Sequence, residues 1–323
     1  SATVSMKQSS FYALYNFFNI FTKIGTPTFI VLSSFVLFYG YYSRPFNINL
    51  IKGFYKKRLL YIVVPYLVFS ALYFLLGRLI NQQPVFSIEA LADFGMKAMT
   101  GQAFAHLYFV LISIQFYLLF PVLLAITKKW KACVPWLVPL GFLVQWGFVF
   151  ANKISLHVPN KGSWSLSYFS FFMLGAALGI YYPKMKQWFA RRKGSGSGYR
   201  IAAAVSLWAA WVGFSTAQVA LYYNARTFGA NYDSLWYEFL WNFQSVFASL
   251  VLIHAAFLIS RYMPSNLLKP LYLLGQYSFG IYLIHLFYLT LYDRYMPAFG
   301  LSWLAHFRYL GSWFFMLGAS WLT

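Results

Sequence analysis

The sequence predicts an all-α protein, a polytopic bundle of transmembrane helices. Of its 323 residues, 61% are hydrophobic and only 9% are charged, whereas a typical soluble domain carries about 25% charged residues. The apolar residues also gather in runs that are long enough to cross a bilayer, which requires about 20 residues per helix. A water-soluble fold of this size could not cover so much apolar surface.

Nine apolar runs of spanning length follow one another along the chain, and short polar or basic segments separate them. They cover residues 26–42, 59–80, 104–126, 132–151, 164–182, 201–223, 235–258, 271–292 and 302–322. Residues 9–22 mix aromatic and polar side chains in patches, which favours a helix at the membrane interface over another span. We expect residues 1–323 to form a single transmembrane domain. Residues 194–198 (GSGSG) read as a flexible cytoplasmic linker, either native or introduced in place of a longer loop.

The charge balance predicts how the chain is oriented in the membrane. There are 25 Lys and Arg residues against 5 Asp and Glu, a formal net charge of +20, which in a soluble protein would suggest nucleic acid. Here the basic residues lie between apolar runs, which is typical of topology signals, so no nucleic-acid partner is expected. Most of them fall in segments 43–58, 127–131, 183–200 and 259–270, which should therefore be cytoplasmic. We expect a multi-pass protein of the plasma membrane with Ser1 outside and Thr323 in the cytoplasm.

Few residues inside the spans can ionise, and such residues are rarely accidental because they are costly in lipid. His106 opens the third span, Glu238 lies one turn into the seventh, and His285 lies in the outer half of the eighth. The predicted orientation places all three near the outer surface. Five scattered histidines and the single cysteine, Cys133, show no metal-ligand spacing, so no metal is expected.

Polar side chains accompany these three residues at helical spacing. The stripes are Glu238, Asn242, Ser245 and Ser249; Ser278, Tyr282 and His285; and His106, Ser113 and Tyr117. Faces of this kind should look into the bundle rather than toward lipid. They can serve as interhelical hydrogen bonds or as the lining of a polar cavity.

A basic cluster stands at the predicted cytoplasmic start of the second span. Lys56, Lys57 and Arg58 follow Phe54 and Tyr55. Arg and Lys donate charge-assisted hydrogen bonds to phosphate oxygens, so the cluster suits a phosphate-bearing ligand. A topology anchor or a contact with anionic lipids would use the same residues. The sequence contains neither a phosphate-binding P-loop nor a serine nucleophile elbow.

Three stretches, in order along the chain, resemble the integral-membrane acyltransferase 3 family. The first joins residues 25–35 (GTPTFIVLSSF) and 55–66 (YKKRLLYIVVPY), the second is 106–121 (HLYFVLISIQFYLLFP), and the third is 274–285 (LGQYSFGIYLIH). Within the family the chain is similar to bacterial enzymes that acylate cell-surface polysaccharides, including the intercellular-adhesion branch. The resemblance implies transfer of an acyl group, most simply acetyl, from cytoplasmic acetyl-CoA or another acyl-CoA to a glycan hydroxyl outside. In the same way it implies that Lys56, Lys57 and Arg58 bind the CoA phosphates and that His106 and His285 lie near the transfer path.

The chain departs from the family pattern at two places. Position 34 is Ser where the family usually has Gly. The family's first span, with a basic residue and the histidine expected to act as general base, has no counterpart in the sequence. Nine spans also leave Ser1 outside, so we expect a tenth span to precede it.

We therefore expect an O-acyltransferase in which an imidazole removes the proton of a sugar hydroxyl. His106, Glu238 and His285 are the candidate catalytic residues. Expected partners are membrane lipids, a glycan or lipid-linked sugar, and components of a polysaccharide synthase. Two alternatives are a transporter or flippase for a polysaccharide or lipid-linked sugar, and a purely structural subunit of a synthase complex.

Overall fold

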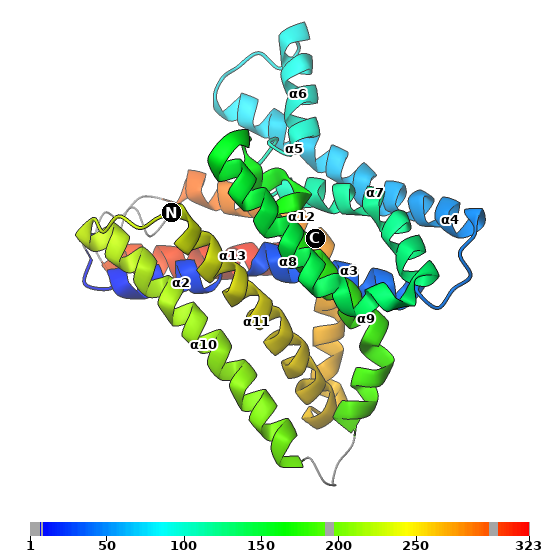
Figure 1. Ribbon diagram of the computed structural model, residues 1–323. Helices are drawn as coiled ribbons and strands as arrows, with labels where there is room; N and C mark the ends of the chain where they lie inside the picture. Colours follow the sequence, from blue (N-terminus) through cyan, green and yellow to red (C-terminus); the bar gives the residue numbers. More distant parts are fainter. Residues whose placement is uncertain (1–6, 8, 191–196, 297–302, 323) are drawn as a thin grey trace. The chain divides into compact units, whose positions relative to one another are not determined.

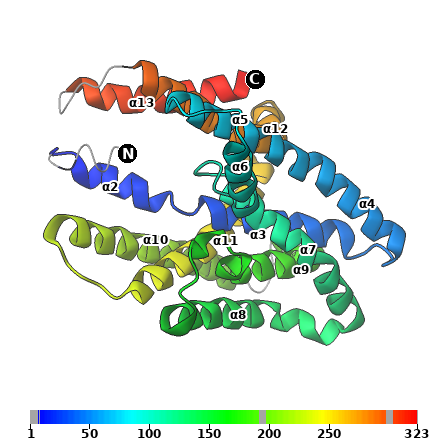
Figure 2. The same cartoon turned by 90° about the horizontal axis from the view of Figure 1, so that it is seen from above.

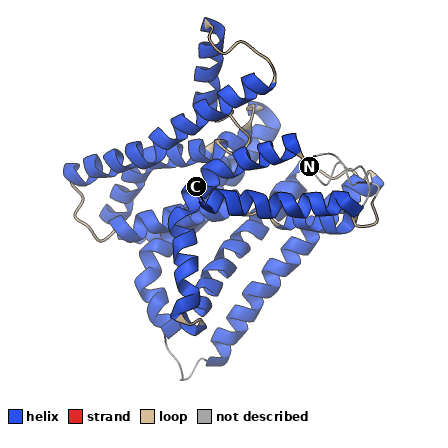
Figure 3. Ribbon diagram, turned by 180° about the vertical axis from the view of Figure 1, so that it is seen from behind, coloured by secondary structure: helices blue, strands red, loops and turns tan. Residues whose placement is uncertain are grey.

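The computed structural model describes residues 7, 9–190, 197–296 and 303–322, and within them it contains helices and no strand (Figure 3). Figure 1 labels the α-helices in chain order. They are α2 (Tyr12–Phe21), α3 (Gly25–Tyr41), α4 (Ile48–Arg58), α5 (Val64–Ile80), α6 (Ile88–Thr100), α7 (Tyr108–Lys129), α8 (Leu137–Ala151), α9 (Phe169–Ala190), α10 (Ser197–Phe228), α11 (Ser234–Tyr262), α12 (Ser265–Tyr295) and α13 (Trp303–Leu322). Short π- or 3-10 helices adjoin them: η1 (Leu59–Val63), η2 (Lys131–Trp136), η3 (Asn152–Leu156), η4 (Lys161–Ser163) and η5 (Ser165–Tyr168).

Each of the nine predicted spans is mostly helical in the residues that the structure describes, although residues 104–107 of the third span form a bend and a turn that precede α7. The helices confirm the all-α transmembrane fold. Among the described residues, seven helical stretches are long and apolar enough to cross a membrane. Helix α2 and helix α3 together make up the first of these stretches. Helices α12 and α13 are not among the seven. In α12 the polar residues Gln276 and His285 interrupt the apolar run. The chain is therefore a multi-pass membrane protein.

The outer surface of the helices supports this conclusion. Large apolar side chains point outward in the middle of the spanning helices, for example Tyr61 (68% exposed), Leu118 (63%) and Leu143 (70%). In water this would be an aggregation-prone surface. In a bilayer such side chains contact lipid tails, and the polar side chains turn inward.

Three local expectations need correction. The predicted loop at 43–58 is helical from Ile48, because the Asn47 side chain accepts a hydrogen bond from the Leu50 amide and caps α4. Helix α6 was not expected; its 13 residues are too few to span a bilayer. The predicted linker 194–198 is already helix from Ser197 onward, and residues 194–196 lie outside the described residues.

The chain divides into two compact units. The first comprises Ser1–Phe29, Pro183–Ser278 and Tyr288–Thr323, and the second comprises Ile30–Tyr182 and Phe279–Phe287. Both are assembled from segments that are distant in sequence. The expectation of a single domain stays a prediction.

In the first unit, α10 and α11 run side by side, as Figures 1 and 2 both show, and α2 packs against α10. The Arg226 guanidinium donates hydrogen bonds to the side-chain oxygens of Asn16 (3.0 Å) and Asn19 (3.2 Å), which ties α10 to α2. Asn16 is fully buried. The asparagine oxygens accept the hydrogen bonds of the guanidinium, so no carboxylate has to be buried beside it.

In the second unit, a small-residue surface on α9 receives α3. Gly175 and Gly179, one helical turn apart, face α3, and a Cβ atom on Gly175 would lie 2.8 Å from the Cβ of Ser34. The Ser34 hydroxyl donates to the Phe172 carbonyl oxygen (2.6 Å), so the two helices are also joined by a hydrogen bond. Small residues spaced by four allow this close approach in lipid. Ser34 is thus small enough to stand where the family usually has glycine.

Replacing Gly175 by alanine should destabilise the protein by about 1–3 kcal/mol, because the added methyl group overlaps the backbone of α3. Gly147→Ala is the matched control: it lies on α8, where a Cβ meets nothing within 4 Å. Thermal unfolding in detergent measures both variants. Equal melting temperatures for the two would contradict the tight α3–α9 contact.

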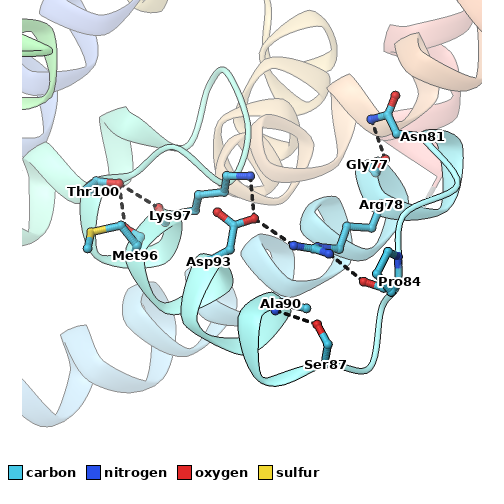
Figure 4. A network of polar contacts seen from close by, with 10 residues as sticks. All are labelled: Gly77, Arg78, Asn81, Pro84, Ser87, Ala90, Asp93, Met96, Lys97 and Thr100. Atoms are coloured by element: carbon cyan, nitrogen blue, oxygen red, sulfur yellow. Dashed lines mark hydrogen bonds and ion pairs between the residues drawn. The ribbon is translucent and has the colours of Figure 1, made fainter.

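Helix α6 is held on α5 by an ion-pair network (Figure 4). The Asp93 carboxylate is 3.0 Å from Lys97 Nζ and 3.2 Å from a guanidinium nitrogen of Arg78, which also donates to the Pro84 carbonyl oxygen. The hydrogen bond from Lys97, and to a lesser degree that from Arg78, lowers the pKa of the Asp93 carboxyl. Ser87 caps the start of α6.

The lowered pKa predicts how the docking of α6 depends on pH. A carboxyl whose pKa is depressed on folding stabilises the fold above its unfolded pKa, and this contribution is lost as the pH falls through the folded value. Amide-exchange protection of α6, corrected for intrinsic rates, should therefore fall as the pH drops below about 4. Asp93→Asn should show reduced protection already at neutral pH, whereas Glu89→Gln, an exposed position in the first turn, should match the wild type. An Asp93→Asn protein with wild-type protection would show that the ion pairs do not hold α6.

Candidate active site

Two of the predicted site residues, His106 and His285, lie together in the second unit. Their ring centroids are 5.2 Å apart, with ring planes at 74°. His106 precedes α7 and is 8% exposed, whereas His285 on α12 is half-buried. The expectation that the two histidines share one depth is met by this contact. Their catalytic role stays a prediction.

Hydrogen bonds join the His106 segment to one turn of α12. His106 Nε2 lies 3.2 Å from the Leu283 carbonyl oxygen, and the Tyr282 hydroxyl donates to the backbone oxygen of His106. His285 Nδ1 lies 2.6 Å from the carbonyl oxygen of Tyr282. The Tyr282 ring contacts both imidazoles. These contacts fix the orientation of both rings.

The same contacts assign the tautomers of the neutral imidazoles. Because a carbonyl oxygen only accepts, His106 carries its proton on Nε2 and His285 carries its proton on Nδ1. The lone pair of His106 is then on Nδ1, which is buried without a hydrogen-bond partner in the described part of the chain. The lone pair of His285 is on Nε2, on the more exposed of the two rings. His285 is therefore the better placed of the two to accept a proton from a bound molecule.

Two aromatic residues that the sequence did not single out support the histidines. The Tyr73 hydroxyl donates to the Leu283 carbonyl oxygen (2.8 Å) and accepts from the Phe287 amide (2.9 Å), so it braces the turn that carries His285. Phe104 stacks on Tyr73 with centroids 4.3 Å apart and lies 5.9 Å from the His106 ring. Neither stands out in the sequence, because tyrosine and phenylalanine occur throughout the apolar runs.

The three residues of the basic cluster differ in exposure, because their positions on α4 point them in different directions. Lys56 and Lys57 are exposed, whereas Arg58 turns its half-buried guanidinium over Phe54 (5.4 Å) and Tyr117 (5.0 Å). Arg58 Nε is buried without a hydrogen-bond partner, and none of the ion pairs in the described residues involves Arg58. An unneutralised guanidinium between aromatic walls can bind an anion.

The irregular helical turn that follows Arg58 can be traced to a proline in the sequence. Pro65 has no N–H and disfavours the regular turn before it, and the turn there is the π-helix η1, which begins directly after Arg58. Tyr117, at one wall of the guanidinium, also lies 3.4 Å from the Ser33 hydroxyl. Residues from α3, α4 and α7 thus lie around the Arg58 guanidinium.

Glu238, the third predicted catalytic residue, lies on α11 in the first unit, whereas both histidines belong to the second. It is half-buried and interacts electrostatically with Tyr222, whose ring also receives Lys23 and Arg226. Asn242, Ser245 and Ser249 on its stripe are buried, as expected. The structure therefore unites the two histidines but does not group Glu238 with them within one unit.

The fold and the site define a multi-pass membrane protein with an internal histidine pair and, apart from it, an arginine between two aromatic rings. A family model described as an acyltransferase domain, Acyl_transf_3, matches residues 3–323. The chain therefore belongs to the acyltransferase 3 family and is a membrane acyltransferase. No curated protein and no solved structure matches it.

Proposed function

We propose that this acyltransferase moves an acetyl group from acetyl-CoA, held at Arg58, to a hydroxyl of an extracytoplasmic glycan. The observation that carries the proposal is the contact between the His106 and His285 rings, both oriented by backbone carbonyl oxygens of α12. A positioned neutral imidazole is the commonest biological general base. The general base that the family resemblance implies lies on a span without a counterpart in this sequence, and we assign the role in this chain to His285.

In the proposed step, His285 Nε2 takes the proton of the sugar hydroxyl while the oxygen attacks the thioester carbonyl carbon. The new C–O bond forms and the C–S bond breaks. The thiolate then takes up this proton from His285, so that the products are an O-acetyl sugar and free CoA and the imidazole is neutral again. His106 stays a second candidate for the proton acceptor, through its buried Nδ1.

The distance between Arg58 and the histidine pair favours an elongated acyl donor. Arg58 and Tyr73, which braces the histidine segment, are 15 residues apart on one helical path through η1 and α5. At 1.5 Å per residue this is on the order of 20 Å. A CoA thioester carries its phosphates and its acyl group at opposite ends of a flexible arm, so it can occupy both sites at once.

Binding of acetyl-CoA tests the donor half of this proposal. Acetyl-CoA should raise the melting temperature of the purified protein, because a ligand that binds the folded state stabilises it by mass action. S-acetylpantetheine, which lacks the nucleotide phosphates, is the control and should stabilise much less. A transporter of glycans would show no stabilisation by acetyl-CoA, and that result would refute the donor assignment.

A further inference from the structure

An open cleft lies beside the histidine segment in the second unit. Its volume is about 560 Å³, within the range of small-molecule sites. The loop after α6, the start of α7 and the loop around η4 form its walls. Among its lining residues are Gln102, Phe104, Tyr108, Asn160, Ser163 and Tyr168.

The chemistry of the lining is neutral. Two amides and three hydroxyls offer both donors and acceptors, three aromatic rings offer apolar faces, and none of the residues lining the cleft is charged. Sugars present alternating hydroxyls and apolar C–H faces, which this combination matches. A phosphate-bearing donor needs cations instead, and those lie at Arg58.

The two amides are free to meet a ligand. Gln102 and Asn160 are exposed, and no side-chain hydrogen bond within the described residues engages either of them. Asn160 has a left-handed backbone (φ 53°) and yet does not cap η4 with its side chain. The Asn160 side-chain amide therefore keeps its donors and acceptor for a ligand.

Hydrogen bonds and close helix packing hold the walls that carry these amides. The Gln115 side chain donates to the Ser163 carbonyl oxygen and accepts from the Ser165 amide, both at 2.8 Å, which fixes the η4 loop on α7. Gly101 has φ 72°, and a Cβ there would lie 2.9 Å from Tyr108 Cα. Only glycine permits this close approach of α6 to α7. A preformed site loses less conformational entropy on binding.

Phe104 connects the cleft to the histidine pair, since it lines the cleft and its ring lies 5.9 Å from that of His106. We propose that this cleft binds the acceptor, a neutral oligosaccharide, with Gln102 and Asn160 donating and accepting hydrogen bonds to its hydroxyls. The identification of the ligand as the acceptor rests on the proposed function.

The experiment compares two double variants of the whole protein in nanodiscs. Gln102→Ala/Asn160→Ala removes the cleft amides, and Asn81→Ala/Gln83→Ala removes two exposed amides of the α5–α6 loop as a matched control. Binding of fluorescent glucose, N-acetylglucosamine, mannose and rhamnose oligomers is measured by polarisation, and acetyl-CoA binding by thermal shift.

The cleft variant should bind the best oligomer at least tenfold more weakly, with unchanged stabilisation by acetyl-CoA, and the control variant should match the wild type. Equal oligomer affinity in both variants, or no binding of any oligomer by the wild type, would overturn the cleft assignment. The proposed function fails separately if the wild type binds an oligomer through the cleft but transfers no acetyl group to it.

Discussion

Replacing His285 by asparagine is expected to lower kcat for acetyl transfer by about 10²–10⁴-fold, the usual contribution of a general base. Asparagine can still donate to the Tyr282 carbonyl oxygen through its amide, as His285 Nδ1 does, but it has no basic nitrogen. The stabilisation by acetyl-CoA should therefore persist while turnover is lost.

The matched control for this variant is His157→Asn. His157 is exposed and has a left-handed backbone (φ 42°), which asparagine tolerates well. This variant should retain wild-type kcat. A His285→Asn protein with full activity would remove His285 from the reaction, and the same substitution at His106 would then test the buried Nδ1.

Replacing Arg58 by alanine is expected to weaken acetyl-CoA binding by about 10- to 100-fold, since a hydrogen bond to a charged group contributes about 1.5–3 kcal/mol. Loss of the guanidinium also leaves the space between Phe54 and Tyr117 without a cation. Arg58→Lys should fall between wild type and alanine, because lysine keeps the charge but loses the planar fork. Isothermal titration with acetyl-CoA gives the affinities.

Arg44→Ala is the control for this series. Arg44 also stacks on a tyrosine, with its guanidinium 5.1 Å from the Tyr41 ring, but its side chain is exposed. Its loss should change the affinity little. Equal weakening by Arg44→Ala and Arg58→Ala would indicate a diffuse basic surface, such as one that contacts anionic lipids, and not a defined site at Arg58.

The sequence predicts the helices well because the bilayer reduces the problem to length and polarity. The boundaries of the second span, 59–80, agree with those of η1 and α5. Helix α4 was missed because its apolar positions are few, although Asn47 offered a capping signal. The spacing of Gly175 and Gly179 is that of a helix-packing motif, and this signal was also missed.

The sequence predicts the site only in part, because membrane depth follows from position along a helix and the choice of neighbouring helices does not. His106 and His285 were expected at one depth, and they do touch. Glu238 was expected at that depth too, but it belongs to the other unit. The orientation of Arg58 toward Phe54, four residues earlier, follows helical spacing and could have been predicted.

The cleft shows a second limit of sequence reasoning. Gln102 and Asn160 are separated by 58 positions and lie in loops without periodicity. Only the packing of α6 and η4 around α7 brings them to one surface.

The most direct test of the proposed function is acetyl transfer by the purified chain in nanodiscs, followed by mass spectrometry of the oligosaccharide. We expect an O-acetylated product that depends on acetyl-CoA, with little product from His285→Asn or Arg58→Ala. Transfer at wild-type rates by both variants, or none by the wild type with any oligomer of the panel, would contradict it.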